Sequence, residues 1–107
     1  MDRRKHPRLI GPFYGHWTLA AGPDTPCRVG DISLGGCFIH SQTTPRAGQQ
    51  VTVTVDQGDG MPVSLSGQVV YEEWSDGFAL KFGSMNATQL GALKELMGRL
   101  RSIRRTA

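Results

Sequence analysis

The chain has 107 residues, of which 38% are hydrophobic and 20% are charged, and its formal net charge is +3. This length is typical of one domain, and the hydrophobic fraction is too high for a disordered chain. No hydrophobic run approaches the length of a membrane span, and no apolar segment follows the basic N-terminus. We therefore expect a cytoplasmic protein with no signal peptide and no membrane insertion.

Short segments with alternating hydrophobic residues predict a mostly β protein. The 14 glycines and six prolines favour many short elements joined by turns. Strands are predicted at residues 13–21, 27–33, 37–40, 49–56, 63–73 and 78–82, and the alternation is clearest at Val51, Val53 and Val55. In the second strand the alternation breaks, which predicts a β-bulge near Gly30. Six strands of this length fit a small closed or nearly closed barrel.

The last part of the chain changes to a helical period. Hydrophobic residues recur at helical spacing over residues 86–103, namely Leu90, Leu93, Leu96, Met97, Leu100 and Ile103. Asn86 and Gln89 have the spacing of a capping box at the start of this helix. We expect the leucine face to pack against the barrel or a second subunit, so the chain would be a monomer or a weak homodimer.

Cysteine, histidine and tryptophan give little sign of catalysis. Cys27 and Cys37 are expected to be buried free thiols, although a disulfide between neighbouring strands stays open. Trp17 and Trp74 are interpreted as packing residues. The histidines lack metal-ligand spacing, and no phosphate-binding loop or pair of catalytic carboxylates is present, so we expect no enzyme activity, no metal and no cofactor.

Two segments carry residues suited to binding an anionic, planar ligand. The basic N-terminal arm contains Arg3, Arg4 and Arg8, and Pro7 argues against a regular helix there. At the end of the second predicted strand, the side chains of Asp31 and Ser33 should share one face, while Ile32 between them points into the core. The following Gly35 and Gly36 permit a turn and a close approach of ligand to backbone. Without the joint pattern, these residues would be read as a solvated tail and a strand end.

The joint pattern, R-x-x-x-R at Arg4 and Arg8 followed by D-x-S-x-x-G at Asp31, Ser33 and Gly36, resembles the PilZ domain family of cyclic di-GMP receptors. The resemblance implies a six-stranded antiparallel barrel with a C-terminal helix over nearly the whole chain. It also implies that the arm (1–12) folds over one face of the barrel (13–83), with the helix at 86–103, in a single domain of residues 1–107.

The resemblance implies a ligand and a mode of signalling. Arg4 and Arg8 would bind guanine, Asp31 and Ser33 would hydrogen-bond to the ligand, and Gly35 and Gly36 would permit close contact. In PilZ relatives a basic residue at the position of Arg3 tends to accompany a stacked ligand dimer. A chain of this kind would order its arm on binding cyclic di-GMP and act on a protein partner, in pathways such as motility or biofilm formation.

Two alternatives stay open on the sequence. The basic ends, at residues 3–8 and 99–105, could bind nucleic acid, although aromatic residues are sparse at 7%. A PilZ fold that binds no nucleotide and acts only as a protein adaptor is the other alternative. The complete set of arginine, aspartate, serine and glycine residues in the motif argues against that second alternative.

Overall fold

The computed structural model describes residues 8–20, 22–56, 62–73 and 76–106, with side chains described as far as residue 102. Six antiparallel strands form a closed barrel in the order β1-β2-β3-β6-β5-β4. Their bounds are β1 Leu9–Leu19, β2 Thr25–Ile32, β3 Gly36–His40, β4 Gln50–Val55, β5 Val63–Glu73 and β6 Gly77–Phe82. One helix follows, α1 at Ala87–Thr106. The predicted fold class, a six-stranded barrel with a C-terminal helix, is confirmed.

The inward positions of the strands are filled by hydrophobic side chains, as the alternation predicted. Val51, Val53 and Val55 of β4 are at most 2% exposed, whereas Thr52 and Thr54 between them lie on the outer wall. Trp17 is buried, donates a hydrogen bond from Nε1 to Ser41 Oγ at 3.0 Å, and meets Phe78 edge to face. The interpretation of Trp17 as a packing residue is confirmed; Trp74 lies outside the described residues.

The start of β1 corrects one expectation. We predicted that the first strand begins at residue 13, after the arm of residues 1–12, but the strand begins at Leu9, which pairs with Ile32 of β2. Proline cannot donate a hydrogen bond within a sheet, and it is tolerated where a strand is irregular. Here the register of β1 against β2 shifts between Ile10 and Phe13, so Pro12 falls inside that irregularity. Of the predicted arm, residues 1–7 lie outside the described part of the chain.

A single extra residue in β2 sets which side chains face outward. The register of β2 against β3 shifts between Val29 and Asp31, which confirms the predicted bulge near Gly30. Val29 and Ile32 are fully buried, although they are three positions apart. Asp31 is thereby placed on the outer wall, opposite Phe38 of β3.

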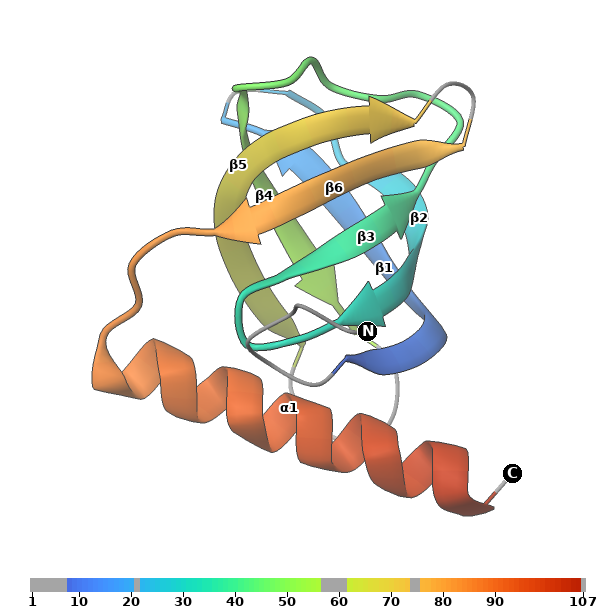
Figure 1. Cartoon of the computed structure of the whole chain (residues 1–107), viewed down its shortest axis with the longest axis vertical. Helices are drawn as coiled ribbons and strands as arrows, with labels where there is room; N and C mark the ends of the chain where they lie inside the picture. Colours follow the sequence, from blue (N-terminus) through green and yellow to red (C-terminus); the bar gives the residue numbers. More distant parts are fainter. Residues whose placement is uncertain (1–7, 21, 57–61, 74–75, 107) are drawn as a thin grey trace, which may run out of the picture.

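Helix α1 lies across one end of the barrel, as Figure 1 shows. Leu93, Leu96 and Leu100 have no exposed surface and belong to the same hydrophobic core as the barrel strands. The helix begins with the predicted capping box, because Asn86 Oδ1 accepts from Gln89 N at 2.8 Å and Gln89 Oε1 accepts from Asn86 N at 3.0 Å. Its leucine face therefore packs against the barrel of its own chain. No helix in the described part of the chain is long and apolar enough to span a membrane.

We predict that Leu96→Ala lowers the free energy of unfolding by about 2–5 kcal/mol, because it leaves a cavity where the helix closes the barrel. Urea denaturation followed by circular dichroism measures this difference. The control is Lys94→Ala, an exposed position on the same helix, which should change the free energy by less than about 0.5 kcal/mol. Equal stability of both variants would show that the helix does not close the core.

Candidate functional site

The turn between β2 and β3 is held by Ser33. The backbone N–H of Ser33 donates to the carbonyl of Gly36 at 2.8 Å, and Ser33 Oγ accepts from Gly35 N at 3.2 Å. The hydroxyl is also 3.4 Å from the Gly36 carbonyl, and only 9% of the residue is exposed. Ser33 therefore has a structural role in closing this turn, in addition to any role in binding.

Gly36 is required by the packing of the neighbouring strand. A Cβ built on Gly36 would lie 2.3 Å from the Leu80 carbonyl oxygen of β6, which is far inside van der Waals contact. The absence of a side chain thus permits β3 and β6 to pair closely. The expectation that Gly36 lets a ligand approach the backbone stays a prediction, and its exposed neighbour Gly35 lies at the same rim.

Arg8 and Asp31 form an ion pair on the outer wall of the barrel. Arg8 Nη1 lies 3.1 Å from Asp31 Oδ2, and the two side chains are 38% and 19% exposed. Arg8 directly precedes β1. Because Ile10 of β1 pairs with Asp31 of β2, the pairing of these two strands places Arg8 close to Asp31. Two of the predicted binding residues are therefore neighbours in space. Arg3 and Arg4 lie outside the described residues.

A cavity of about 300 Å³ adjoins this ion pair, and we call it the Ser33 cavity. One side is formed by the predicted residues Arg8, Ser33, Gly35 and Gly36. The other side comes from the outer wall of three strands: β3, β6 and β5, which contribute Phe38, Ala79, Lys81, Val70 and Tyr71. Four predicted site residues therefore line one cavity, and Asp31 is held at its rim by Arg8.

The wall residues of the Ser33 cavity were not predicted from the sequence. Phe38 and Tyr71 have ring centroids 6.5 Å apart, and Tyr71 is 50% exposed. The register of β5 against β6 shifts between Val69 and Tyr71, so Val70 and Tyr71 are both exposed in succession. Phe38 could have been found from the sequence, because it occupies an outward position on the strand after Asp31. Tyr71 could not, since its orientation depends on that shift.

The two cysteines are free and buried, as expected. Burial raises the pKa of Cys27 to about 11, with a smaller contribution from the negative charge of Asp56. Burial also raises the pKa of Cys37 far above its usual range, and the carboxylate of Asp31 adds to this effect. A thiol with a raised pKa is a poor nucleophile, because the reactive species is the thiolate. Cys37 lines the Ser33 cavity but has no chemistry to offer there.

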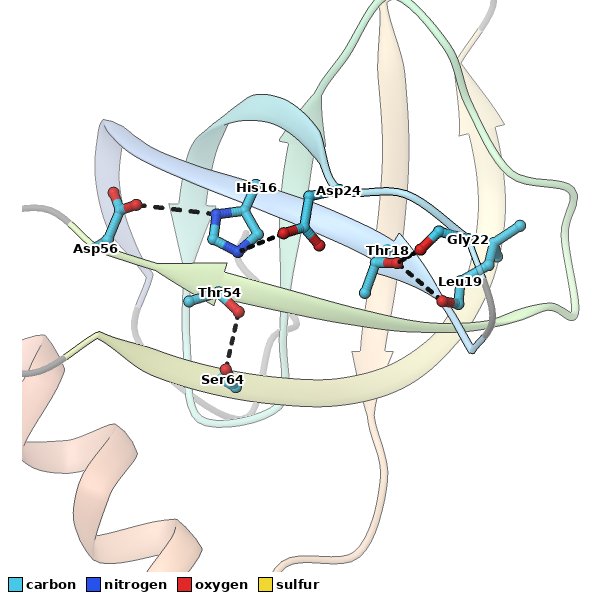
Figure 2. A network of polar contacts seen from close by, with 8 residues as sticks. All are labelled: His16, Thr18, Leu19, Gly22, Asp24, Thr54, Asp56 and Ser64. Atoms are coloured by element: carbon cyan, nitrogen blue, oxygen red, sulfur yellow. Dashed lines mark hydrogen bonds and ion pairs between the residues drawn. The ribbon is translucent and has the colours of Figure 1, made fainter.

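A second polar network lies on the outer wall of β1, β4 and β5 (Figure 2). Both ring nitrogens of His16 face carboxylates, with Nε2 3.8 Å from Asp24 and Nδ1 3.9 Å from Asp56. Thr54 and Ser64 share a hydrogen bond of 2.8 Å beside it. These residues do not line the Ser33 cavity. Within the described ranges no group of three or more potential ligands could hold a metal ion.

Comparison with known proteins identifies the class of this barrel. The family model of the PilZ domain matches residues 2–99. A search of curated proteins found no match. The chain is a member of the PilZ domain family.

Solved structures share the fold at low sequence identity. The PilZ domain of YcgR from Escherichia coli, solved with c-di-GMP, has a TM-score of 0.80 and 17% identity, covering 98% of this chain and 96% of that one. The PilZ domain of CeSA from a cellulose-synthesizing bacterium has a TM-score of 0.73 and 16% identity, covering 89% and 98%. The Bacillus subtilis inhibitor of motility, MotI/DgrA, has a TM-score of 0.69 and 14% identity, and this chain covers 54% of its length.

We predict that alkylation of Cys27 by iodoacetamide at pH 8 is about a hundredfold slower or more than that of an unfolded thiol, since a pKa of about 11 leaves about one thiolate in a thousand. Mass spectrometry of timed samples measures the rate, and the same reaction in urea is the control. The folded state favours the protonated thiol of Cys27. The free energy of unfolding is therefore unaffected by this thiol below about pH 8.5, and it falls as the pH rises from there toward 11. Fast labelling of the folded chain would contradict the burial of Cys27.

Proposed function

We propose that this PilZ domain is a receptor for cyclic di-GMP and that it binds the nucleotide at the Ser33 cavity. The observation that carries the proposal is the Arg8–Asp31 pair at the rim of a cavity lined by the Ser33–Gly36 turn. The pair combines a donor fork with a carboxylate acceptor, which are the two groups that a guanine edge requires. The related YcgR domain, solved with c-di-GMP, supports this choice of ligand.

On binding, Arg8 and Asp31 would give up their contact with each other and would each contact guanine. Arginine binds guanine O6 and N7 in a bidentate manner, and such a contact is worth about 1–3 kcal/mol. A carboxylate accepts from guanine N1–H and the exocyclic amine. The ion pair that must open is partly exposed, and pairs of that kind contribute only about 0–1 kcal/mol. Breaking the ion pair therefore costs less free energy than the guanine contacts contribute.

The far wall of the cavity supplies further contacts of the same order. An exposed aromatic ring such as Tyr71 stacks on a nucleobase, and stacking contributes about 1–3 kcal/mol per base. Lys81 is an exposed cation on β6 that lines the cavity, so it is suited to a phosphate oxygen. The site thus offers stacking, hydrogen bonding and charge, and it offers no activated nucleophile. We propose binding without catalysis, and no metal or other cofactor.

The arm and the output are part of the same proposal. Arg4 would act with Arg8 on the ligand, and Arg3 would offset the phosphates of a stacked ligand pair. Ordering the arm costs backbone entropy of about 1–2 kcal/mol per residue, which the contacts of the arm with the bases, the phosphates and the barrel must together offset. The ordered arm and ligand would form a new surface for a protein partner in the cytoplasm, in a pathway such as motility or biofilm formation.

We predict that Arg8→Ala and Asp31→Ala each weaken cyclic di-GMP binding by about tenfold to a hundredfold, since each removes one set of guanine contacts. Isothermal titration calorimetry measures the dissociation constant, and the stoichiometry distinguishes one bound nucleotide from two. GTP, cyclic di-AMP and a short single-stranded RNA serve as ligand controls, and Lys94→Ala serves as the protein control.

Two outcomes of that titration would contradict the proposal. Salt-sensitive binding of RNA with no heat from cyclic di-GMP would favour the nucleic-acid alternative. No binding of any nucleotide by the folded wild-type chain would leave the adaptor alternative.

We also predict that deletion of residues 1–8 abolishes cyclic di-GMP binding while the barrel stays folded, because the deletion removes all three arm arginines and ends before β1, and Arg8, the one deleted residue that the structure describes, is exposed. Calorimetry measures the binding, and the midpoint of thermal unfolding, expected within a few degrees of wild type, is the control. Wild-type affinity after the deletion would rule out a role for the arm.

A further inference from the structure

A second and larger cavity lies on the outer wall of β1, β2 and β3, and we call it the Arg28 cavity. Its volume is about 660 Å³, and Tyr14, Arg28, His40 and Asp76 are among its lining residues. Tyr14 pairs with Arg28 across β1 and β2, and Arg28 pairs with His40 across β2 and β3. Three strands therefore place these side chains in one row across the sheet. None of them is used by the site proposed above.

The two cavities are adjacent, and a pair of aromatic rings lies between them. Phe38 lines the Ser33 cavity and His40 lines the Arg28 cavity, with ring centroids 5.0 Å apart. Gly30 makes room for the imidazole, because a Cβ there would lie 2.5 Å from His40 Nε2. The absence of a side chain at the bulge thus lets His40 pack against β2.

The Arg28 cavity also offers a cation, the guanidinium of Arg28. Arg28 is exposed and forms no ion pair with any residue that the structure describes. Tyr14 is 62% exposed, so its ring is accessible for stacking on a planar group. An arginine fork beside accessible rings is the combination that binds a purine with its phosphate.

The two cavities repeat the same chemistry. The Ser33 cavity has Arg8 with Asp31 at its rim and Tyr71 in its wall, and the Arg28 cavity has Arg28, Asp76 and Tyr14. Cyclic di-GMP also repeats its chemistry, because it consists of two identical guanosine units joined through two phosphates. The Ser33 cavity and the Arg28 cavity have volumes of about 300 and 660 Å³, and the sum of the two lies within the range of about 300–1,000 Å³ found for ligand sites.

We propose that one molecule of cyclic di-GMP spans both cavities, with its second guanine in the Arg28 cavity. This inference rests on the proposed function, adds the residues that bind the second half of the ligand, and puts a single bound molecule in place of the stacked ligand pair considered for Arg3. Arg28 donates its fork to guanine O6 and N7, and the rings of Tyr14 and His40 contact the base. The Phe38–His40 pair lies beneath the ribose–phosphate ring that connects the two bases.

The test is the affinity of Arg28→Ala for cyclic di-GMP, measured by calorimetry on the full chain. We expect a loss of about tenfold to a hundredfold, the size of one bidentate guanine contact. Arg28→Lys should recover little of this loss, because lysine keeps the charge but lacks the fork. Lys94→Ala is the matched control, since it removes an exposed cation from α1, and it should bind as wild type does. Thermal unfolding of each variant tests that the barrel is intact.

The outcomes separate this inference from the proposed function. Wild-type affinity in Arg28→Ala, with weakened binding in Asp31→Ala, would overturn the spanning ligand and leave the receptor proposal standing. A change from two bound nucleotides to one in Arg28→Ala, at unchanged affinity, would also overturn it, because the Arg28 cavity would then hold a separate molecule. No binding by the wild-type chain would overturn both.

A second measurement does not depend on any variant. In an isotope-labelled sample, cyclic di-GMP should shift the backbone amide resonances of Tyr14, Arg28 and His40 together with those of Ser33 and Gly36, at the same ligand concentrations. Shifts confined to the Ser33 cavity would contradict the proposal.

Discussion

The bulge at Gly30 is the constraint on which the site depends. Side chains alternate along a strand, so without an extra residue the burial of Cys27 and Val29 would continue at Asp31 and place its carboxylate in the core. An unpaired carboxylate there would be strongly unfavourable. The bulge instead turns Asp31 outward and returns Ile32 to the core. It also brings Gly30 beneath His40, which lines the Arg28 cavity, while Asp31 is paired with Arg8 at the rim of the Ser33 cavity.

The sequence predicted the parts of this arrangement that arise from local periodicity. Alternation in β4, the helical spacing in α1 and the capping box at Asn86 are local patterns, and each predicted its element correctly. The bulge was predictable because it breaks such a pattern. The strand at Leu9 was not, because Pro12 and the basic arm suggested coil, and the pairing of Leu9 with Ile32 depends on a residue distant in the sequence.

The same distinction applies to the candidate site. Arg8, Ser33 and Gly36 were found from a motif and Gly35 from the turn beside it, and all four line one cavity. Phe38, Lys81 and Tyr71 come from β3, β6 and β5, and the pairing of β3 with β6, which lie far apart in the sequence, brings them together. Ser33 is a motif residue that also stabilises the fold, because its hydroxyl accepts a hydrogen bond from Gly35 in the turn that contains the two glycines.

Stability and binding are assigned to different parts of the molecule. The core is closed at one end by α1, whose leucines have no exposed surface, and opening it would cost several kcal/mol. The Arg8–Asp31 pair lies on the outside and contributes at most about 1 kcal/mol. In the proposed function, a ligand would therefore replace that pair at little cost to the stability of the barrel. Because the core holds the strands that carry both cavities, the proposed binding would change contacts on the outer wall and leave the packing inside the barrel as it is.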